Sequence, residues 1–422
     1  MIQTHTLPNG LRIVMERLPY LRSASVGIFV KTGSILESLQ ETGLSHFIEH
    51  MAFKGTTSRS ARQLAEEMDM IGGNVNAATS KVCTSYYART TDKDLPLALN
   101  LLADLVVHPN PNEEDFAKER GVIQEEIAME ADSPEDLVFN LIHEGLYDGQ
   151  SLSRTILGKR ETIGGYSLDA LEMFRKRFYQ PANAVLAVTG RFDPHSLILQ
   201  AEKEFSSWQG SEQAVFPENT FQEGGYSLTL EKDIEQTHLC VAFKALPSLH
   251  KDRHALIALS TAFGGGVSSR LFQIVREEKG LVYNIYCAPA FYPQCGDFTI
   301  YAACSPRNLQ QVLSIIRQET SEIVSNGLSE KEFQQTMAQL RTGFVLSMES
   351  AYQRMASLGI NLLLHDRIIT PRETIAQMKG VKLKDVNRVA RDLLGKEPKL
   401  AFVGKHIAKN LNRKGTVPHG QA

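Results

Sequence analysis

The sequence has 422 residues, of which 42% are hydrophobic and 22% are charged. This composition is typical of a globular protein with a sizeable core, and the length predicts two to four domains at roughly 100–200 residues each. The 45 basic and 48 acidic residues leave a net charge of −3, so the chain offers no basic field for nucleic acid. Five cysteines without a CxxC motif indicate reduced thiols inside a cell. A disulfide scaffold and a disordered chain are disfavoured.

The N-terminal sequence and the apolar runs predict where the protein resides. The first residues lack the charged segment and apolar stretch of a signal peptide, and they lack the arginine-rich and serine-rich character of a transit peptide. The longest apolar runs, such as Leu101–Val107, are far too short to span a bilayer. We therefore expect a cytoplasmic protein that binds neither a membrane nor nucleic acid.

Strand and helix patterns are mixed along the first half of the chain. Its opening predicts two strands joined by the turn at Asn9-Gly10, and Ala24–Lys31 alternates like a half-buried strand. Residues 74–90, rich in Thr, Val and Tyr, predict one or two strands, and an apolar strand is expected at residues 183–189. Helices are predicted at residues 44–54, 60–71, 92–107, 112–130, 134–147 and 167–179.

Short segments of the first half recur in the second half in the same order. The pairs are residues 24–31 and 237–244, 160–163 and 372–375, and 187–190 and 401–404, at offsets of 212 to 214 residues. This near-constant offset indicates two copies of one domain. We predict an α+β fold with two tandem homologous domains, each a mostly antiparallel sheet flanked by helices. The expected boundaries are residues 1–209 and 226–408 for the two domains, 210–225 for a linker and 409–422 for a flexible tail.

The segment His46-Phe47-Ile48-Glu49-His50 places three potential metal-site side chains on a predicted helix. His46, Glu49 and His50 lie within an arc of about 100°, and apolar residues occupy the opposite side. Two imidazoles four residues apart can bind one zinc ion, with a carboxylate one turn away to hold a water. This HxxEH spacing is the inverzincin signature. The alternative is a helix with two half-exposed histidines and a glutamate, and a third ligand decides between the two interpretations.

An acidic helix predicted farther along the chain supplies candidates for a third ligand. Glu119, Ile123 and Glu126 share one face of it, because seven residues return to within about 20° of the start. Glu125 points about 100° away from Glu126. A helix that packs its Val122 and Ile123 side inward would therefore bury Glu119 and Glu126, for which a cation is the natural partner. The alternative is an acidic, solvated helix.

These residues make the sequence resemble the pitrilysin family of zinc metallopeptidases, especially the mitochondrial processing peptidase β-subunit and its bacterial relatives. The segment GLSHFIEHMAFKGT (43–56) matches the zinc motif of that family almost residue for residue. The third ligand of the family lies in a segment of the form ERxVIxxE, which is Glu119–Glu126 here and follows the second histidine at the family's spacing. The resemblance covers nearly the whole chain. It implies that zinc is bound by His46, His50 and Glu126, and that Glu119 supports the site from outside the ligand shell.

The segment Gly72–Tyr87 resembles the edge strand of the family's active site. An extended peptide can add to such an edge, where main-chain hydrogen bonds position the scissile bond. Asn76 and Ala77 match the positions that are expected to contact the peptide. The alternative is an ordinary strand with Asn76 in a turn.

The second half resembles the metal-free domain of the same family. Its counterpart of the zinc helix, residues 255–266, contains no histidine or glutamate, so only the first copy is expected to bind metal. Arg276 and Tyr283 match a pair that contacts substrate in the family, as donors to a carbonyl on which negative charge develops. The alternative is that Arg276 pairs with a nearby glutamate and Tyr283 packs in a sheet.

The resemblance implies a zinc endopeptidase that cleaves peptides or extended segments of unfolded proteins, with one Zn²⁺ per chain. Three protein ligands leave the fourth position to water, and Glu49 would accept a proton from this water and pass it to the leaving amine. One alternative is an inactive zinc-binding structural subunit, like the core proteins of the respiratory bc1 complex. Another is a peptide-binding partner that activates a second subunit. The undamaged motif disfavours both.

The resemblance also implies an assembly. Within the family, four such domains enclose a chamber, in one long chain or in two half-length chains. This chain supplies two domains, so we expect a homodimer, or a heterodimer with an inactive paralogue. A two-fold arrangement would leave no open surface for filament growth. An enclosed chamber would favour flexible peptides and unfolded segments over folded proteins.

Overall fold

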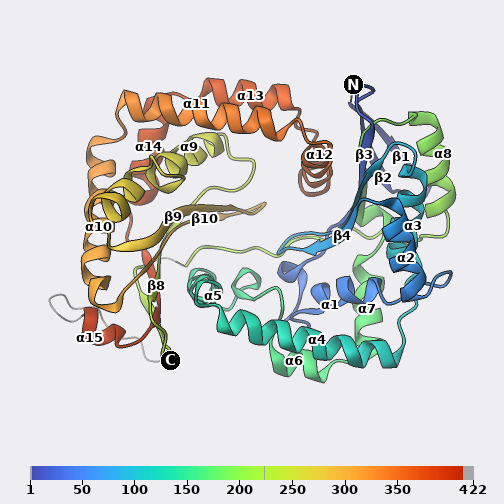
Figure 1. Ribbon diagram of the computed structural model, residues 1–422, viewed down its shortest axis with the longest axis horizontal. Coiled ribbons are helices and arrows are strands. Elements are labelled where there is room, and N and C mark those ends of the chain that lie inside the picture. The colour runs from blue at the N-terminus through green and yellow to red at the C-terminus, as the bar shows by residue number, and fades with distance from the viewer. Residues whose placement is uncertain (1, 223, 412–422) are drawn as a thin grey trace. The chain divides into compact units, whose positions relative to one another are not determined.

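The computed structural model describes residues 2–222 and 224–411, which form two compact units, each built on one β-sheet (Figure 1). The first unit contains the residues up to Ala128, Arg154–Pro217 and Val345–Pro371. The second contains Met129–Ser153, Glu218–Phe344 and the residues from Arg372 on. In the described part of the chain, no helix is long and apolar enough to span a membrane.

The first sheet has six strands in the order β1-β2-β6-β3-β5-β4, and all its pairs are antiparallel except β2 with β6. Strand β4 therefore lies at an edge of the sheet, with β5 as its partner. The segment expected to form one or two strands forms the hairpin of β4 and β5. The strands are β1 (Ile2–Thr6), β2 (Arg12–Arg17), β3 (Ser23–Val30), β4 (Asn74–Thr79), β5 (Thr84–Thr91) and β6 (Ala184–Gly190).

Both faces of the first sheet are covered, because its central strands are apolar on both sides. Val26 and Ile28 of β3 belong to the main core with the helices of the N-terminal half, whereas Phe29 packs on the other face against Met355 and Leu358. The helices of this unit are α1 (Leu44–Ala52), α2 (Ala61–Ile71), α3 (Leu95–Val107), α6 (Arg160–Gly165), α7 (Leu168–Phe178), α8 (Pro194–Phe205) and α12 (Ala351–His365), with short 3₁₀ turns at Ser34–Leu36 and Pro181–Asn183.

Helix α12, which comes from the C-terminal half of the sequence, covers the second face of the first sheet. A Cβ atom at Gly359 would lie 2.4 Å from the ring of Phe29, so only glycine allows the helix this close to β3. Arg354 of α12 also forms a salt bridge of 2.6 Å with Glu16 of β2, and both side chains are largely buried. The helix is therefore an integral part of the first unit.

The second sheet has five strands in the order β7-β11-β8-β10-β9, with β7 and β11 parallel and the other pairs antiparallel. Helices α9, α10 and α14 contribute the core of one face, and α5 packs on the other, where Phe139 stacks on Tyr301 of β10. The strands are β7 (Ser227–Glu231), β8 (Thr237–Lys244), β9 (Val282–Phe291), β10 (Gly296–Cys304) and β11 (Lys399–Gly404). The helices are α5 (Pro134–Leu146), α9 (Arg253–Gly264), α10 (Leu309–Asn326), α13 (Pro371–Gly380), α14 (Leu383–Leu394) and α15 (Ile407–Leu411), with the π-helix η4 (Phe272–Glu278) and 3₁₀ turns at Ser151–Ser153 and Pro306–Asn308.

The two sheets share one topology, since β2-β6-β3-β5-β4 of the first has the same order and directions as β7-β11-β8-β10-β9 of the second. Two of the three recurring pairs of segments lie in equivalent strands, β3 with β8 and β6 with β11, and the third pair lies in helices α6 and α13. The predicted α+β class with two homologous domains is confirmed. Helices α4 (Glu113–Asp132) and α11 (Glu330–Ser347) each begin in one unit and end in the other.

The units do not follow the two halves of the sequence, because they exchange helices. Helix α5 comes from the first half and belongs to the second unit, and α12 does the reverse. The predicted linker at residues 210–225 stays a prediction about where the two sequence copies join. The predicted tail at 409–422 begins inside α15, and its residues 412–422 lie outside the described residues.

Candidate metal centre

Helix α1 carries the HxxEH residues on its open face. His46, Glu49 and His50 are partly exposed, and the opposite face is buried. Phe47 on that buried face stacks on Phe116 of α4, with ring centroids 4.7 Å apart and planes at 3°. This stacking joins α4 to α1. It therefore sets which residues of α4 meet the two histidines.

Helix α4 brings Glu126 to the histidines. Its Oε2 atom lies 3.7 Å from Nε2 of His46 and 3.6 Å from Nε2 of His50. Glu125, at the neighbouring position, is exposed and points elsewhere, as the helical phase predicts. Val122, expected to face inward beside the buried Ile123, is instead 43% exposed. The inward face is narrower than predicted, because the buried residues of α4 are Phe116, Glu119 and Ile123.

These three donor atoms suit a zinc ion. His46, His50 and Glu126 form the one group of three potential ligands found among the described residues, with ligand atoms within 4.8 Å of one another. Ligands bound at ~2.0–2.2 Å to a tetrahedral ion lie roughly 3.3–3.6 Å apart, close to the separations here. Two imidazoles and one carboxylate are also a typical catalytic donor set for zinc. The residues therefore fit the metal that the sequence predicts.

The protonation of His46 favours metal binding. Burial, with a further effect of the neighbouring His50, lowers the pKa of His46 to about 4. The imidazole is therefore neutral at neutral pH, as a metal ligand must be. Its Nδ1 atom is buried without a hydrogen-bond partner. The other ring nitrogen, Nε2, lies 3.7 Å from Oε2 of Glu126 and is the atom that His46 offers as a metal ligand.

Glu119 holds His50 in the orientation that a ligand requires. Its Oε2 atom lies 3.0 Å from Nδ1 of His50, so this nitrogen carries the proton and leaves Nε2 for the metal. The other oxygen lies 2.5 Å from Nζ of Lys54, and the carboxylate is buried. The pair with Lys54 compensates the buried negative charge. Glu119 thus has the geometry expected of a supporting residue.

Replacing Glu119 with glutamine is expected to weaken zinc binding or activity by roughly 10–100-fold, the usual effect of an outer partner. The amide still accepts one hydrogen bond but carries no charge to balance Lys54 or to raise the basicity of His50. Titration of the metal-free protein with zinc, alongside peptide cleavage, measures both effects. Wild-type affinity and rate in this variant would reduce Glu119 to an ordinary acidic residue.

Glu49 lies on the same face of α1 without belonging to the ligand group. Burial is the main cause that raises its pKa, and the charge of Glu126 adds to the effect. A hydrogen bond from Thr79 and the charge of His50 act in the opposite direction. A carboxylate with a raised pKa is a better proton acceptor near neutral pH. Its position and environment therefore suit a general base.

The start of α1 is capped by the distant carboxylate of Glu37. Its two oxygens accept hydrogen bonds from the backbone N–H groups of Gly43 and Ser45, each at 2.8 Å. Burial raises the pKa of Glu37 from 4.5 to about 7, against the lowering effect of these bonds and of Arg154. Each pKa unit corresponds to about 1.4 kcal/mol, so burial of this group makes stability depend on pH.

Glu37→Gln is expected to remove that dependence. Because the folded state binds the Glu37 proton more tightly, this contribution to stability is full below about pH 4.5 and is lost as the pH rises through about 7. The free energy of unfolding of the variant, relative to that of wild type, should therefore rise by about 2–3 kcal/mol when the pH is raised from 5 to 8. Urea unfolding followed by the fluorescence of Trp208, the single tryptophan and buried in the first unit, measures this. If the variant and wild type differ in free energy of unfolding by the same amount at both pH values, the prediction is wrong.

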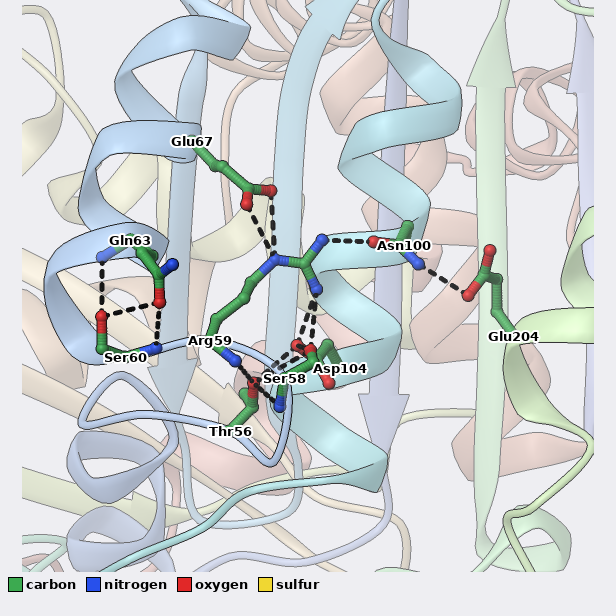
Figure 2. A network of polar contacts seen from close by, with 9 residues as sticks. All are labelled: Thr56, Ser58, Arg59, Ser60, Gln63, Glu67, Asn100, Asp104 and Glu204. Carbon is green, nitrogen blue, oxygen red and sulfur yellow. Dashed lines mark hydrogen bonds and ion pairs between the residues drawn. The ribbon is translucent and has the colours of Figure 1, made fainter.

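The turn that follows α1 is fixed by a polar network around Arg59 (Figure 2). Arg59 binds Glu67 of α2 at 3.1 Å and Asp104 of α3 at 2.7 Å. Asp104 also accepts hydrogen bonds from Thr56 at 2.6 Å and Ser58 at 2.7 Å. Helices α2 and α3 therefore hold in place the turn that follows α1 and supplies Lys54 to Glu119.

Comparison with known proteins identifies the family of this chain. Residues 12–160 match the family described as insulinase (peptidase family M16), and residues 166–340 match the peptidase M16 inactive domain. The uncharacterized zinc protease YmxG of Bacillus subtilis is 38% identical over 403 residues, which cover 96% of this chain and 98% of YmxG. The chain belongs to peptidase family M16. The resemblance predicted from the sequence is thereby confirmed.

Other proteins are similar to this chain in length or in fold. An uncharacterized zinc protease of Streptomyces coelicolor is 36% identical, with 98% of this chain and 91% of that protein covered. The crystal structure of a protease from Helicobacter pylori has a TM-score of 0.87 at 23% identity, covering 96% of this chain and 99% of that one. The peptidase M16 inactive domain from Pseudomonas fluorescens has a TM-score of 0.89 at 18% identity, covering 96% and 98%. At these identities the two structures show a shared fold alone.

The M16 resemblance also assigns substrate contacts to Asn76 and Ala77, which lie in the edge strand β4. The side chain of Asn76 is exposed, and its Oδ1 accepts a hydrogen bond of 2.8 Å from the N–H of Ala77. Ala77 points into the core. Asn76 is part of a strand and not of a turn, and its contact with a peptide stays a prediction.

Arg276 and Tyr283 lie in the second unit, in η4 and β9 respectively. The guanidinium of Arg276 lies 5.1 Å from the ring centroid of Tyr283 and 3.8 Å from the carboxylate of Glu277. The contact with Glu277 agrees with the alternative interpretation, in which Arg276 pairs with a nearby glutamate. Tyr283 lies in the edge strand β9, but its side chain is 76% exposed, unlike a side chain that packs on the sheet. Their role toward a substrate stays a prediction.

Two residues near the M16 motif escaped the sequence analysis. Thr79 lies within the segment interpreted as the edge strand, and strand alternation alone would have placed it on the face of the buried Ala77. Glu37 offers no signal in the sequence, because it caps α1 from six residues before Gly43, outside any local capping motif.

Proposed function

We propose that this chain is a zinc-dependent endopeptidase that cleaves peptides or extended segments of unfolded proteins. The observation that carries the proposal is one cluster in the first unit. Two imidazole nitrogens and a carboxylate oxygen converge at 3.6–3.7 Å, with Glu49 beside them on the same helix. The name zinc protease, carried by relatives at 36–38% identity, supports the same reaction class.

Each side chain of this cluster has its own role in the proposed reaction. His46, His50 and Glu126 would hold one zinc ion, which when bound polarises the scissile carbonyl and makes the attacking water more acidic. Glu49 accepts one proton from that water and delivers it to the leaving amine nitrogen. Glu119 keeps Nε2 of His50 directed at the site through the bond at Nδ1.

Residues outside this cluster would position the substrate. The edge of β4 would pair with an extended peptide near Asn76 and Ala77. Arg276 and Tyr283 would donate hydrogen bonds to the scissile carbonyl or its neighbours as negative charge develops there.

The second candidate function is an inactive zinc-binding subunit of the same family. One match favours it, because residues 166–340 fit a family described as an inactive domain. That segment does not include the HxxEH motif at residues 46–50. An inactive first domain would not need Glu49, which binds no metal in this scheme. The peptidase is therefore the better proposal.

Metal analysis of the purified protein, together with cleavage of a mixed peptide library, tests the proposal. We expect one zinc per chain and cleavage that stops with a chelator and returns with zinc. Zinc at full occupancy without cleavage of any peptide would support the inactive subunit. Faster cleavage of a denatured protein than of its folded form would indicate the expected preference for unfolded segments.

We also propose that the protein is a cytoplasmic homodimer, or a heterodimer with an inactive paralogue. Two domains per chain are half of the four that enclose a chamber in the resembling family. The five cysteines are all free and buried, as suits a reducing compartment. Sedimentation of the active enzyme decides the assembly, and an active monomer of 46.9 kDa would refute it.

A further inference from the structure

The hydroxyl of Thr79 donates a hydrogen bond to Oε2 of Glu49. Thr79 is the last residue of β4 and lies directly opposite Thr84 of β5. Because side chains alternate along a strand, Thr79 lies on the same face of β4 as the buried Ala77, which packs in the core that includes α1. The sheet thus presents this hydroxyl to the helix that carries Glu49.

The turn between β4 and β5 is held by hydrogen bonds and by close packing. The Ser80 hydroxyl accepts a hydrogen bond from the N–H of Cys83 at 3.1 Å and donates one to the carbonyl of Cys83 at 2.8 Å. The N–H of Ile35 donates to the carbonyl of Lys81 at 2.9 Å. A Cβ atom at Gly33 would lie 2.3 Å from the Ser80 carbonyl oxygen, so glycine permits the contact. Thr79 is therefore placed by the fold, before any substrate binds.

The proton of the Thr79 hydroxyl has two possible acceptors. One is Glu49, and the other is the hydroxyl oxygen of Thr84 at 3.4 Å. Thr84 donates its own proton to the carbonyl of Thr32 at 3.2 Å, so it cannot donate to Thr79 as well. An ionised carboxylate is the stronger acceptor. The hydrogen bond therefore runs from Thr79 to Glu49.

We propose that Thr79 is the positioning residue of the general base, an inference that rests on the peptidase function proposed above. Its hydrogen bond holds Oε2 of Glu49, so Oε1 is the atom that exchanges protons. As the water oxygen bonds to the carbonyl carbon, one proton of the water moves to Oε1. The same proton passes to the amine nitrogen when the C–N bond breaks. Without the hydroxyl, only the weaker hydrogen bond from the backbone N–H of Thr79 remains, and the carboxylate rotates among orientations of which few are productive.

Two matched variants test this role. Thr79→Val keeps the volume and branching of the side chain and removes the hydroxyl, whereas Thr79→Ser keeps the hydroxyl. We expect Thr79→Val to lower kcat about 10–100-fold, with KM and zinc content within about 2-fold of wild type. Thr79→Ser should keep kcat within about 3-fold of wild type. In a Glu49→Gln background, Thr79→Val should have no further effect, because it acts through Glu49.

Crystal structures of the metal-free wild type and Thr79→Val give a readout independent of activity. We expect the Glu49 carboxylate to be displaced, or to occupy more than one conformer, in the valine variant. An unchanged carboxylate, a wild-type kcat at full zinc content, or an effect on KM alone would overturn the proposal. A wild-type protein that cleaves no peptide would refute the peptidase function, and the two crystal structures would still decide the role of Thr79.

Discussion

Replacing Glu49 with glutamine is expected to leave the zinc content unchanged and to lower kcat by about 10²–10⁴-fold, the contribution of a general base. Glutamine has nearly the same shape and still accepts the hydrogen bond from Thr79, but it cannot take a proton from water. Glu49 is also outside the three-residue ligand group. Metal analysis and steady-state kinetics on one peptide measure the two quantities on the same preparation.

Glu125→Gln is the matched control for this experiment, because Glu125 is an exposed acid on the neighbouring helix α4. It should keep both zinc and kcat. Stoichiometric loss of metal in Glu49→Gln would make Glu49 a structural part of the site and refute its role as base. A wild-type rate in that variant would refute it as well.

Removing any of the three ligands is expected to lower zinc affinity more than about 100-fold, beyond the roughly 10–100-fold effect of an outer partner. His46→Ala and His50→Ala each remove one imidazole of the pair on α1. Glu126→Gln removes the charge that faces both imidazoles at 3.6–3.7 Å. Competition with a chromogenic chelator measures the affinity without reference to activity.

The same control applies to the ligand series. Glu125→Gln should bind zinc like wild type, although it removes an acid one position before Glu126. Zinc loss in Glu125→Gln, with normal binding in Glu126→Gln, would contradict both the spacing and the helical phase. Normal binding in all three ligand variants would mean that the cluster in the first unit is not the metal site.

Local patterns predicted most of the elements around the site. The spacing of His46, Glu49 and His50 predicted which residues share a face of α1, since the period of a helix is a local property. The phase of α4 predicted that Glu126 faces inward and Glu125 outward. Val122 was placed wrongly because the width of a buried face depends on the partner helix, and the Phe47–Phe116 stacking that sets it involves residues far apart in the sequence.

Contacts between distant segments could not be predicted in this way. Periodicity shows that a helix has an apolar face but not which sheet that face covers, so the exchange of α5 and α12 was missed. The hydrogen bonds from Gly43 and Ser45 to Glu37 depend on the path of the intervening loop. Thr79 meets Glu49 only because the edge hairpin folds over α1. In each case the contact depends on how the chain folds back on itself.

The place of α12 in the sequence also affects how the protein can fold during its synthesis. The helix begins 161 residues after β6 ends, so the ribosome completes all six strands of the first sheet long before it makes α12. At 5–20 residues per second, the apolar face that includes Val14, Phe29 and Val185 stays uncovered for roughly 8–30 s. An uncovered apolar sheet face is a place where nascent chains aggregate or bind chaperones. All three candidate metal ligands are made within the first third of the chain, yet the sheet beneath them is completed only by a helix from its last fifth.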